Sequence, residues 1–146
     1  MSSSPDETLA VSEAIKKLFK DYEKAFSELD IERSADFFAD TFISAGPNGT
    51  ITNSKAEFLK SASQASNFYR SVGQKSAKIL SLNKQLITNQ YSLVKVHWGV
   101  TFEKSGDKVI EFDVSYLLQK TETEPKIILF IAHQDEEKAM RELGLL

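Results

Sequence analysis

Hydrophobic positions change their spacing once along the chain, near residue 74. Before this point apolar residues recur every three or four positions, as in the run Ile15, Leu18, Phe19, Tyr22, Phe26 and Leu29. This spacing places them on one face of a helix. After this point apolar and polar residues alternate, which is typical of a strand with one buried face. The pattern therefore predicts helices followed by antiparallel strands.

Start and stop signals divide the helical part into three segments. Ser4-Pro5-Asp6-Glu7 predicts an N-cap, a proline in the first turn and a capping box for the first helix. Asp30 is expected to cap a short second helix that runs through Phe38. A second capping box, Ser54-Lys55-Ala56-Glu57, starts a third helix that Gly73 would end. The serine-rich middle of this helix leaves open a break near Asn67.

A short hairpin is expected between the second and third helices. Phe42 to Ala45 reads as a strand, Gly46-Pro47-Asn48-Gly49 as a tight turn, and Thr50 to Thr52 as the returning strand. A strand that stops so soon after an aromatic-rich helix suggests that this corner is the lip of a pocket.

Four longer strands are expected in the second half, at 75–87, 94–102, 110–119 and 126–133, and a terminal helix from Asp135 to about Gly144. The two central strands each carry an apolar row: Val94, Val96, Trp98, Val100 and Phe102 on one, and Ile110, Phe112, Val114, Tyr116 and Leu118 on the other. If Ser105-Gly106-Asp107 forms a three-residue loop, Phe102 faces Ile110 and Trp98 faces Val114. Both apolar rows then lie on the same side of the sheet.

These elements predict an α+β fold, a cone-shaped roll in which three N-terminal helices pack on a curled antiparallel sheet, with a short C-terminal helix. The chain has 146 residues, of which 41% are apolar and ten are phenylalanine. That is enough to build one hydrophobic core. We expect a single domain over residues 1–146, with residues 1–4 as a flexible tail.

Charge and cysteine content narrow the classes of partner. The net charge is −3, and the basic residues are scattered apart from the loose group Lys75, Lys78 and Lys84, which suits a solvated strand face better than a phosphate track. The absence of cysteine excludes disulfides and cysteine-ligated metals. The amino terminus does not resemble a secretory signal, and the longest apolar run, Ile127 to Ala132, is too short to span a bilayer. We expect a soluble cytoplasmic protein with no nucleic-acid or membrane partner, no cofactor and no metal.

One arrangement of residues resembles a known superfamily. The pattern is Tyr22…Phe26…Leu29-Asp30…Phe38-Ala39-Asp40…Phe42, followed by Gly46-Pro47 and the paired long strands. It resembles the first helices and first strand of the nuclear transport factor two-like superfamily, which includes ketosteroid isomerase, polyketide cyclases and many uncharacterised small proteins. The resemblance runs from about Ser12 to His133. It implies the cone-shaped fold and an interior pocket, and it says little about activity.

The isomerase of this superfamily offers a test for catalysis. Its mechanism needs an Asp base and an oxyanion hole made by a Tyr and a protonated Asp. The resemblance places Tyr22 at the oxyanion tyrosine, Gly46 at the base, and the second acid near Val114, where the inward row holds no acid. Asp113 is adjacent but has outward parity. Because two of three roles are missing, we expect no catalysis by this mechanism.

The sequence nominates one pocket, lined by Tyr22, Phe26, Phe38, Phe42, Trp98, Tyr116 and His133. Tyr22 could donate a hydrogen bond to a bound carbonyl and Trp98 could stack on a flat ligand, although both also suit a packed core. His133 could act as a base or lie on a polar rim beside Asp135. A small-molecule-binding domain with an apolar or aromatic ligand is the first hypothesis, and an isomerase or cyclase using Tyr22 and His133 is the alternative.

A third hypothesis places function on the outer sheet face. Leu80, Leu82, Leu93 and Leu117 are apolar residues on rows that are otherwise polar, and both rows of 127–131 are apolar. Such a surface predicts a protein partner, and we expect a homodimer. The resemblance implies the same, since members of the superfamily commonly pair through this face. His97 lies on the polar row and is expected at the surface or the interface.

Overall fold

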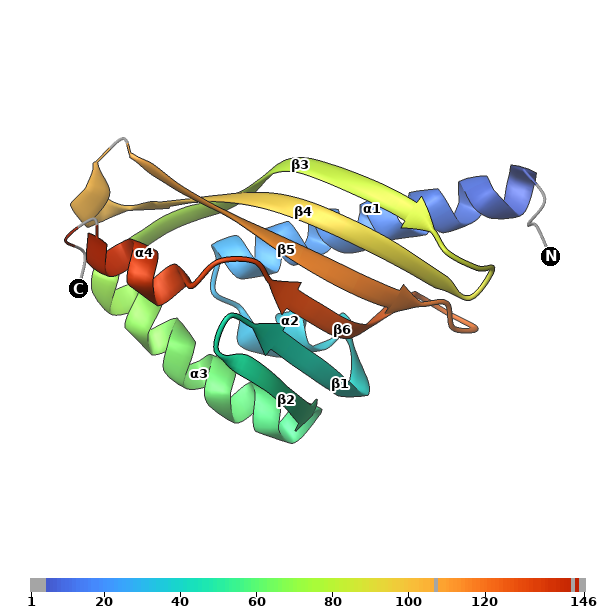
Figure 1. Ribbon diagram of the computed structural model, residues 1–146, viewed down its shortest axis with the longest axis horizontal. Helices are drawn as coiled ribbons and strands as arrows, with labels where there is room; N and C mark the ends of the chain where they lie inside the picture. Colours follow the sequence, from blue (N-terminus) through green and yellow to red (C-terminus); the bar gives the residue numbers. More distant parts are fainter. Residues whose placement is uncertain (1–4, 107, 143, 145–146) are drawn as a thin grey trace.

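A long helix lies against a strongly curled six-stranded sheet in the computed structural model (Figure 1). The structure describes residues 5–106, 108–142 and 144. The expected cap Ser4, the expected tail at 1–4 and the loop residue Asp107 lie outside the described residues. The long strands β3, β4 and β5 curve over α1, while α3 and α4 lie at the other end of the molecule from the start of α1 (Figure 1).

The three expected N-terminal helices are confirmed as α1 (Pro5–Ser27), α2 (Ile31–Ala35) and α3 (Lys55–Val72), and a terminal helix α4 covers Glu136–Glu142. Asp30 caps α2 through the amide of Arg33. Ser54 and Glu57 form the predicted capping box of α3, which is continuous and ends at Gly73 in the left-handed conformation, with φ 84°. No helix among the described residues is long and apolar enough to cross a membrane.

The sheet contains β1 (Phe38–Gly46), β2 (Gly49–Ser54), β3 (Gln74–Leu86), β4 (Tyr91–Phe102), β5 (Val109–Gln119) and β6 (Lys126–Ala132) in the order β2-β1-β6-β5-β4-β3. The α+β roll is thus confirmed. One neighbouring pair differs from the antiparallel expectation, because β1 runs parallel to β6. Alternation within a strand carries no information about which distant strand it joins.

The boundary between α2 and β1 differs from the sequence expectation. The second helix ends at Ala35 instead of Phe38, and the first strand begins at Phe38 instead of Phe42. Phe38 pairs with Ile127 of β6, and the amide of Ile127 donates to the carbonyl oxygen of Phe37 at 2.9 Å. Pairing with a strand some 90 residues away therefore overrides the local helical spacing.

The register of β4 and β5 also differs, by two residues. Trp98 faces Phe112 and Val100 faces Ile110, whereas the three-residue loop would have paired Phe102 with Ile110. A 3₁₀ turn at Glu103–Ser105 (η1) lengthens the connection. A shift of two positions keeps the parity of both strands, so the two apolar rows still share the inner face, and all ten of their residues are buried.

Helix α1 protects the edge of the sheet at β3. The amide of Ile79 donates to Oε2 of Glu23 at 2.6 Å, and the amide of Ala77 donates to Oγ of Ser27 at 3.1 Å. Unpaired amides on an edge strand would otherwise invite pairing with another chain. These contacts also fix the height of α1 over the sheet, and with it the position of Tyr22 and Phe26.

The outer face of the sheet carries a mixed surface. Leu80 is 49% exposed beside Gly99, and Val109 lies on the other side of that glycine. Leu82 was expected on this face, but it packs against the core and pairs with Val96 of the inner row. The reason is a bulge between Ile79 and Ser81, which reverses the parity of the rest of β3.

A charged cluster lies at the centre of this outer face. His97 contacts two carboxylates of β5, with Nδ1 2.8 Å from Oδ1 of Asp113 and Nε2 2.9 Å from Oε1 of Glu111. The hydrogen bond to Glu111, and then that to Asp113, raises the pKa of His97. The hydrogen bond from His97 lowers the pKa of Asp113. Within the described residues, no group of three or more potential ligands is arranged to hold a metal ion.

We predict that His97 stabilises the fold in mildly acidic solution and less so in alkaline solution. A raised pKa in the folded state means that protonation of His97 favours folding. This stabilisation is fully present at pH values below the pKa of histidine in the unfolded chain, about 6.5. The contribution is lost as the pH rises through the folded pKa. His97→Gln should therefore lower the melting temperature more at pH 5.5 than at pH 8.5, measured by differential scanning calorimetry.

Removal of the two carboxylates provides the control for this prediction. In a Glu111→Gln, Asp113→Asn background, His97→Gln should have nearly the same effect at both pH values. An effect of His97→Gln that does not change with pH in the wild-type background would contradict the prediction.

Candidate ligand-binding site

The structure brings six of the seven nominated side chains together in one aromatic cluster, formed by Tyr22, Phe26, Phe38, Phe42, Trp98 and Tyr116. Helix α1 supplies Tyr22 and Phe26, one helical turn apart, and the remaining four come from β1, β4 and β5. The inner face of the curled sheet thus meets the apolar stripe of α1.

Tyr22 is the hub of this cluster. Its ring centroid lies 5.8 Å from that of Trp98, 6.0 Å from that of Tyr116 and 6.0 Å from that of Phe38. Tilted and edge-on arrangements at these distances are favourable for aromatic pairs. Tyr22 is half-buried, and its ring closes one side of the cluster.

Trp98 and Tyr116 are locked to each other beneath Tyr22. Nε1 of Trp98 donates to Oη of Tyr116 at 3.1 Å, and the two side chains are 0% and 3% exposed. Phe42, expected at the lip, is also buried against Phe38 and Phe58. Side chains therefore fill the centre of the cone, and open space borders the cluster beside Tyr22 and Phe26.

The seventh nominated residue, His133, lies elsewhere. It follows β6, its side chain is exposed, and Nε2 is 2.7 Å from Oγ of Ser115. Ser115 is on the outward row of β5, as is Asp113, which contacts His97. The structure thus places His133 and Asp113 on the outer face of the sheet, opposite the aromatic cluster.

The turn at Gly46–Gly49 borders a broad surface depression of about 500 Å³, which also includes Gln134 and Asp135. Asn48 closes one side of it by donating from Nδ2 to Oδ2 of Asp135 at 3.3 Å. The depression does not include the nominated aromatic residues. The turn therefore shapes the rim of the molecule beside the hairpin.

A smaller cavity opens beside Tyr22 and Phe26, between α1, α2 and α3. We call it the chamber. Its volume is about 120 Å³, and it is lined by Tyr22, Phe26, Leu29, Ile31, Ser34, Phe58, Ala62, Ala65, Ser66 and Tyr69. The lining is almost entirely apolar and aromatic, with hydroxyl groups as its polar members.

Ser66 gives the chamber an unusual feature. Its side chain is 97% buried, with 3% relative exposure, and its hydroxyl has no hydrogen-bond partner among the described residues. Other serines of α3 bond to the helix backbone, Ser61 to the carbonyl oxygens of Glu57 and Phe58, and Ser71 to that of Phe68. A buried hydroxyl without a partner is destabilising, so this position calls for an explanation.

A second buried polar atom lies behind the same aromatic wall. Gln74 donates from Nε2 to the carbonyl oxygen of Phe26 at 3.1 Å, while its Oε1 is buried and unpartnered in the described part of the chain. Gln74 borders a narrow crevice of about 10 Å³ that shares Phe26 and Tyr69 with the chamber. The Ser66 hydroxyl and Oε1 of Gln74 are therefore two buried polar atoms in adjoining spaces that share Phe26 and Tyr69 as lining residues.

Sequence reasoning nominated Tyr22 and Phe26, which line the chamber, and missed its other lining residues. The remaining nominated aromatic residues pack behind the chamber and do not line it, namely Phe38, Phe42, Trp98 and Tyr116. Ser66 and Tyr69 continue the helical stripe of Phe58 and Ala62, and the serine-rich segment was interpreted only as weak helix. A serine at a core position of an amphipathic helix was the available signal. The partner-less state of its hydroxyl depends on tertiary packing and could not be deduced from spacing.

The chamber has the chemistry of a neutral binding site. No Asp, Glu, His, Lys or Arg is among the described residues that line it. An apolar pocket with a few polar groups is the usual form of a small-molecule site. A bound molecule could exchange a hydrogen bond with the Ser66 hydroxyl, which both donates and accepts.

Comparison with solved structures shows the same fold in proteins of distant sequence. An NTF2-like protein with a cystatin-like fold from Novosphingobium aromaticivorans superposes with a TM-score of 0.74 at 15% identity, covering 93% of this chain and 90% of that one. An NTF-2 like protein of unknown function from Shewanella oneidensis gives a TM-score of 0.71 at 14% identity, covering 84% and 98%.

A third structure carries a functional name. A protein from Novosphingobium aromaticivorans provisionally named a scytalone dehydratase gives a TM-score of 0.70 at 16% identity, covering 88% of this chain and 87% of that one. No curated protein matches the sequence significantly. At these identities the likeness establishes the fold alone.

The family model described as NTF2-like protein (DUF6841) matches residues 12–135. This segment includes α2, α3 and all six strands, and it begins within α1 close to the limit that the sequence resemblance suggested. The chain therefore belongs to the DUF6841 family of NTF2-like proteins.

Proposed function

We propose that this protein is a small-molecule-binding domain whose chamber takes a small aromatic or apolar ligand with one polar group. The observation that supports this proposal is the buried Ser66 hydroxyl, which has no partner among the described residues and borders an aromatic cavity. A ligand hydroxyl or carbonyl would satisfy it. Tyr22, Phe26 and Tyr69 would contact the ring or chain of the ligand.

The size of the chamber favours a ligand of one ring. The chamber opens to solvent, and its volume of about 120 Å³ is somewhat below the ~150 Å³ of an enclosed engineered cavity that binds benzene. A longer molecule would extend past Ser34 or Ala65 toward solvent. Phenol and toluene are therefore suitable probes, since they differ by the polar group that Ser66 would recognise.

Binding is a better proposal than isomerisation, cyclisation or dehydration. Those reactions move protons and need a positioned acid or base. The chamber has no carboxylate or imidazole among its described lining residues, Gly46 stands where the resemblance implies the base, and His133 and Asp113 lie on the outer face. An activity that used Tyr22 alone would lack a proton acceptor.

The binding proposal predicts a specific change of preference in Ser66→Ala. Phenol and toluene are titrated into ¹⁵N-labelled protein, and amide shifts of α1 and α3 report binding. Loss of one neutral hydrogen bond of about 1 kcal/mol should lower the affinity for phenol roughly fivefold and leave that for toluene nearly unchanged.

Ser61→Ala is the matched control, because Ser61 is exposed on the same helix and bonds to backbone carbonyl oxygens. It should leave both affinities unchanged. Shifts that avoid the chamber, or equal losses for phenol and toluene in Ser66→Ala, would overturn the proposal.

The same variant should stabilise the unliganded protein. Replacing a buried hydroxyl without a partner by alanine removes a desolvation penalty of about 1–3 kcal/mol and adds a better helix former. We expect Ser66→Ala to raise the free energy of unfolding by about 1 kcal/mol in urea titrations, while Ser61→Ala changes it by less than about 0.5 kcal/mol. A destabilised Ser66→Ala variant would mean that the hydroxyl is satisfied in the folded protein.

We also propose that the protein forms a homodimer through the outer sheet face. Val109 and Ile131 are 44% and 42% exposed there, and Leu93, Leu117 and Leu129 are half-buried in adjacent strands. At a protein concentration of tens of micromolar, an interface of standard size should hold. Light scattering at this concentration should therefore give twice the mass of the chain. Ile131→Glu should give a monomer, whereas Ile51→Glu, on the exposed edge strand β2, should not.

A further inference from the structure

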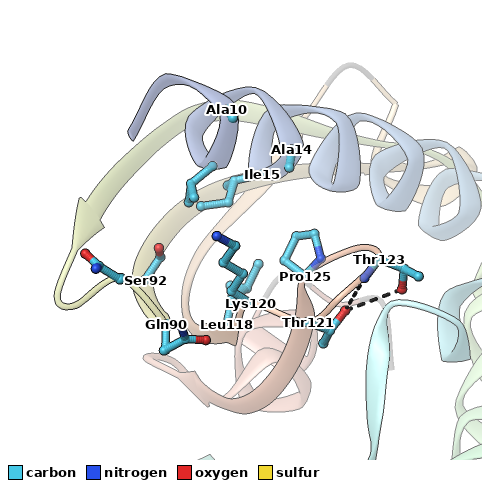
Figure 2. Close-up of a pocket in the computed structure, with 12 residues that line it drawn as sticks. Ala10, Ala14, Ile15, Gln90, Ser92, Leu118, Lys120, Thr121, Thr123 and Pro125 are labelled. Carbon is cyan, nitrogen blue, oxygen red and sulfur yellow. Dashed lines mark hydrogen bonds between the residues drawn. The ribbon is translucent and has the colours of Figure 1, made fainter. Parts of the chain in front are cut away.

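A second cavity lies at the end of the molecule opposite α3 and α4. We call it the end pocket. Its volume is about 230 Å³, and it is enclosed by the first half of α1, the turn between β3 and β4, and the loop between β5 and β6 (Figure 2). It has room for the equivalent of roughly eight molecules of liquid water at ~30 Å³ each. The sequence did not reveal it, because its walls come from three segments far apart in the chain.

The inner wall of the end pocket is apolar. Ile15 and Leu118, which are 2% and 1% exposed, form its deep side, and the small residues Ala10 and Ala14 of α1 leave the space open above them (Figure 2). Val11 and Pro125 complete the apolar lining. A hydrocarbon chain or ring would lose water contact on entering this space, and that favours its binding.

The polar side of the pocket carries a single charge among its described lining residues. The described polar lining residues are Asn89, Gln90, Ser92, Lys120, Thr121 and Thr123. Lys120 is the one charged residue among them, and Figure 2 shows its side chain reaching from the end of β5 toward α1. Its backbone is held by the hydrogen bond from its amide to the carbonyl oxygen of Gln90 at 2.7 Å, and no ion pair to its ammonium is present among the described residues.

The loop after Lys120 keeps acidic groups out of the pocket. Thr121 and Thr123 line it, whereas the alternating residues Glu122 and Glu124 are exposed and do not. Thr121 Oγ1 accepts from the amide of Thr123 at 3.2 Å (Figure 2). The same hydroxyl donates to the carbonyl oxygen of Glu124, and the two bonds hold this alternation in place. The Ser92 hydroxyl, on a side chain that is 95% buried with 5% relative exposure, adds a polar group near the apolar wall.

We propose that the end pocket binds a small amphipathic carboxylate, with its hydrocarbon part against Ile15 and Leu118 and its carboxylate at Lys120. An apolar interior with one cation and no acid among its described lining residues complements this class of molecule, whereas a phosphate ester would need more donors than one exposed lysine provides. This is a site separate from the chamber. Phe19, fully buried, packs on Tyr22 and Tyr116 between the two cavities.

Octanoate and 1-octanol are the probes, since they share a chain length and differ in charge. Each is titrated into the ¹⁵N-labelled full chain, and octanoate is expected to shift amides within 10–15, 89–92 and 118–125. Raising the salt concentration from 20 to 200 mM should weaken octanoate binding and leave 1-octanol binding unchanged.

Lys120→Gln should weaken octanoate binding roughly threefold to fivefold, the effect of one partly exposed ion pair, and should not change 1-octanol binding. Lys104→Gln, at the exposed turn η1, is the matched control and should change neither. Ala14→Leu should block both probes by filling the cavity, and Ala10→Leu, at a more exposed position of the same lining, replaces it if the first variant does not fold.

The proposal is overturned if octanoate shifts only chamber or outer-face amides, if 1-octanol binds as tightly as octanoate at low salt, or if Lys104→Gln and Lys120→Gln weaken octanoate equally. Failure of phenol to bind the chamber would leave these results unaffected, because the two cavities share none of their described lining residues.

Discussion

The hydrogen bond from the Trp98 indole to the Tyr116 hydroxyl, buried inside the cone, is the constraint on which the rest of the interior depends. Tyr116 lies four positions beyond Phe112, the residue opposite Trp98, so the two large side chains lean toward each other along the sheet. Each satisfies a polar group of the other that would be costly to bury alone. Tyr22 of α1 then packs on both rings, and the register of helix against sheet follows.

This aromatic cluster decides where a molecule can enter. In a cone with smaller inner residues, the space along the sheet would be continuous. Here the centre is filled with rings, and space remains on either side, at the chamber beside Tyr22 and Phe26 and at the end pocket beside Ile15. Both cavities lie along the buried face of α1. The first half of this face carries the small or aliphatic residues Ala10, Ala14 and Ile15, and the second half carries the rings of Tyr22 and Phe26. The two sites consequently differ in chemistry, one neutral and aromatic, the other aliphatic with a cation.

The two faces of the sheet use opposite means to achieve stability. The inner rows of β4 and β5 are buried by hydrophobic contact alone, apart from Trp98, Tyr116 and Ser92. The outer rows of β4 and β5 carry His97 with its two carboxylate partners, together with leucines that are half-exposed. The half-exposed leucines would gain from removal of water, whereas the charged groups around His97 would lose hydration.

Local patterns in the sequence were enough to predict the order of helices and strands and the inward rows of β4 and β5, but not the boundary between α2 and β1. Helical spacing and capping boxes depend on neighbours three or four positions away, and strand parity depends on every second residue, so a local pattern suffices for both. That is why Ser54, Gly73 and the rows from Val94 and Ile110 were predicted in place. Three features became visible only in the folded chain: the parallel pairing of β1 with β6, the two-residue shift of register between β4 and β5, and the bulge that turns Leu82 inward. Each arises from contacts between distant segments. The cavities depend on the same contacts. Six nominated residues did gather, but the open spaces lie beside them, the chamber bordered by Ser66 and the end pocket by Lys120. The volume left by packed side chains is a property of the assembled fold that no spacing in the sequence encodes.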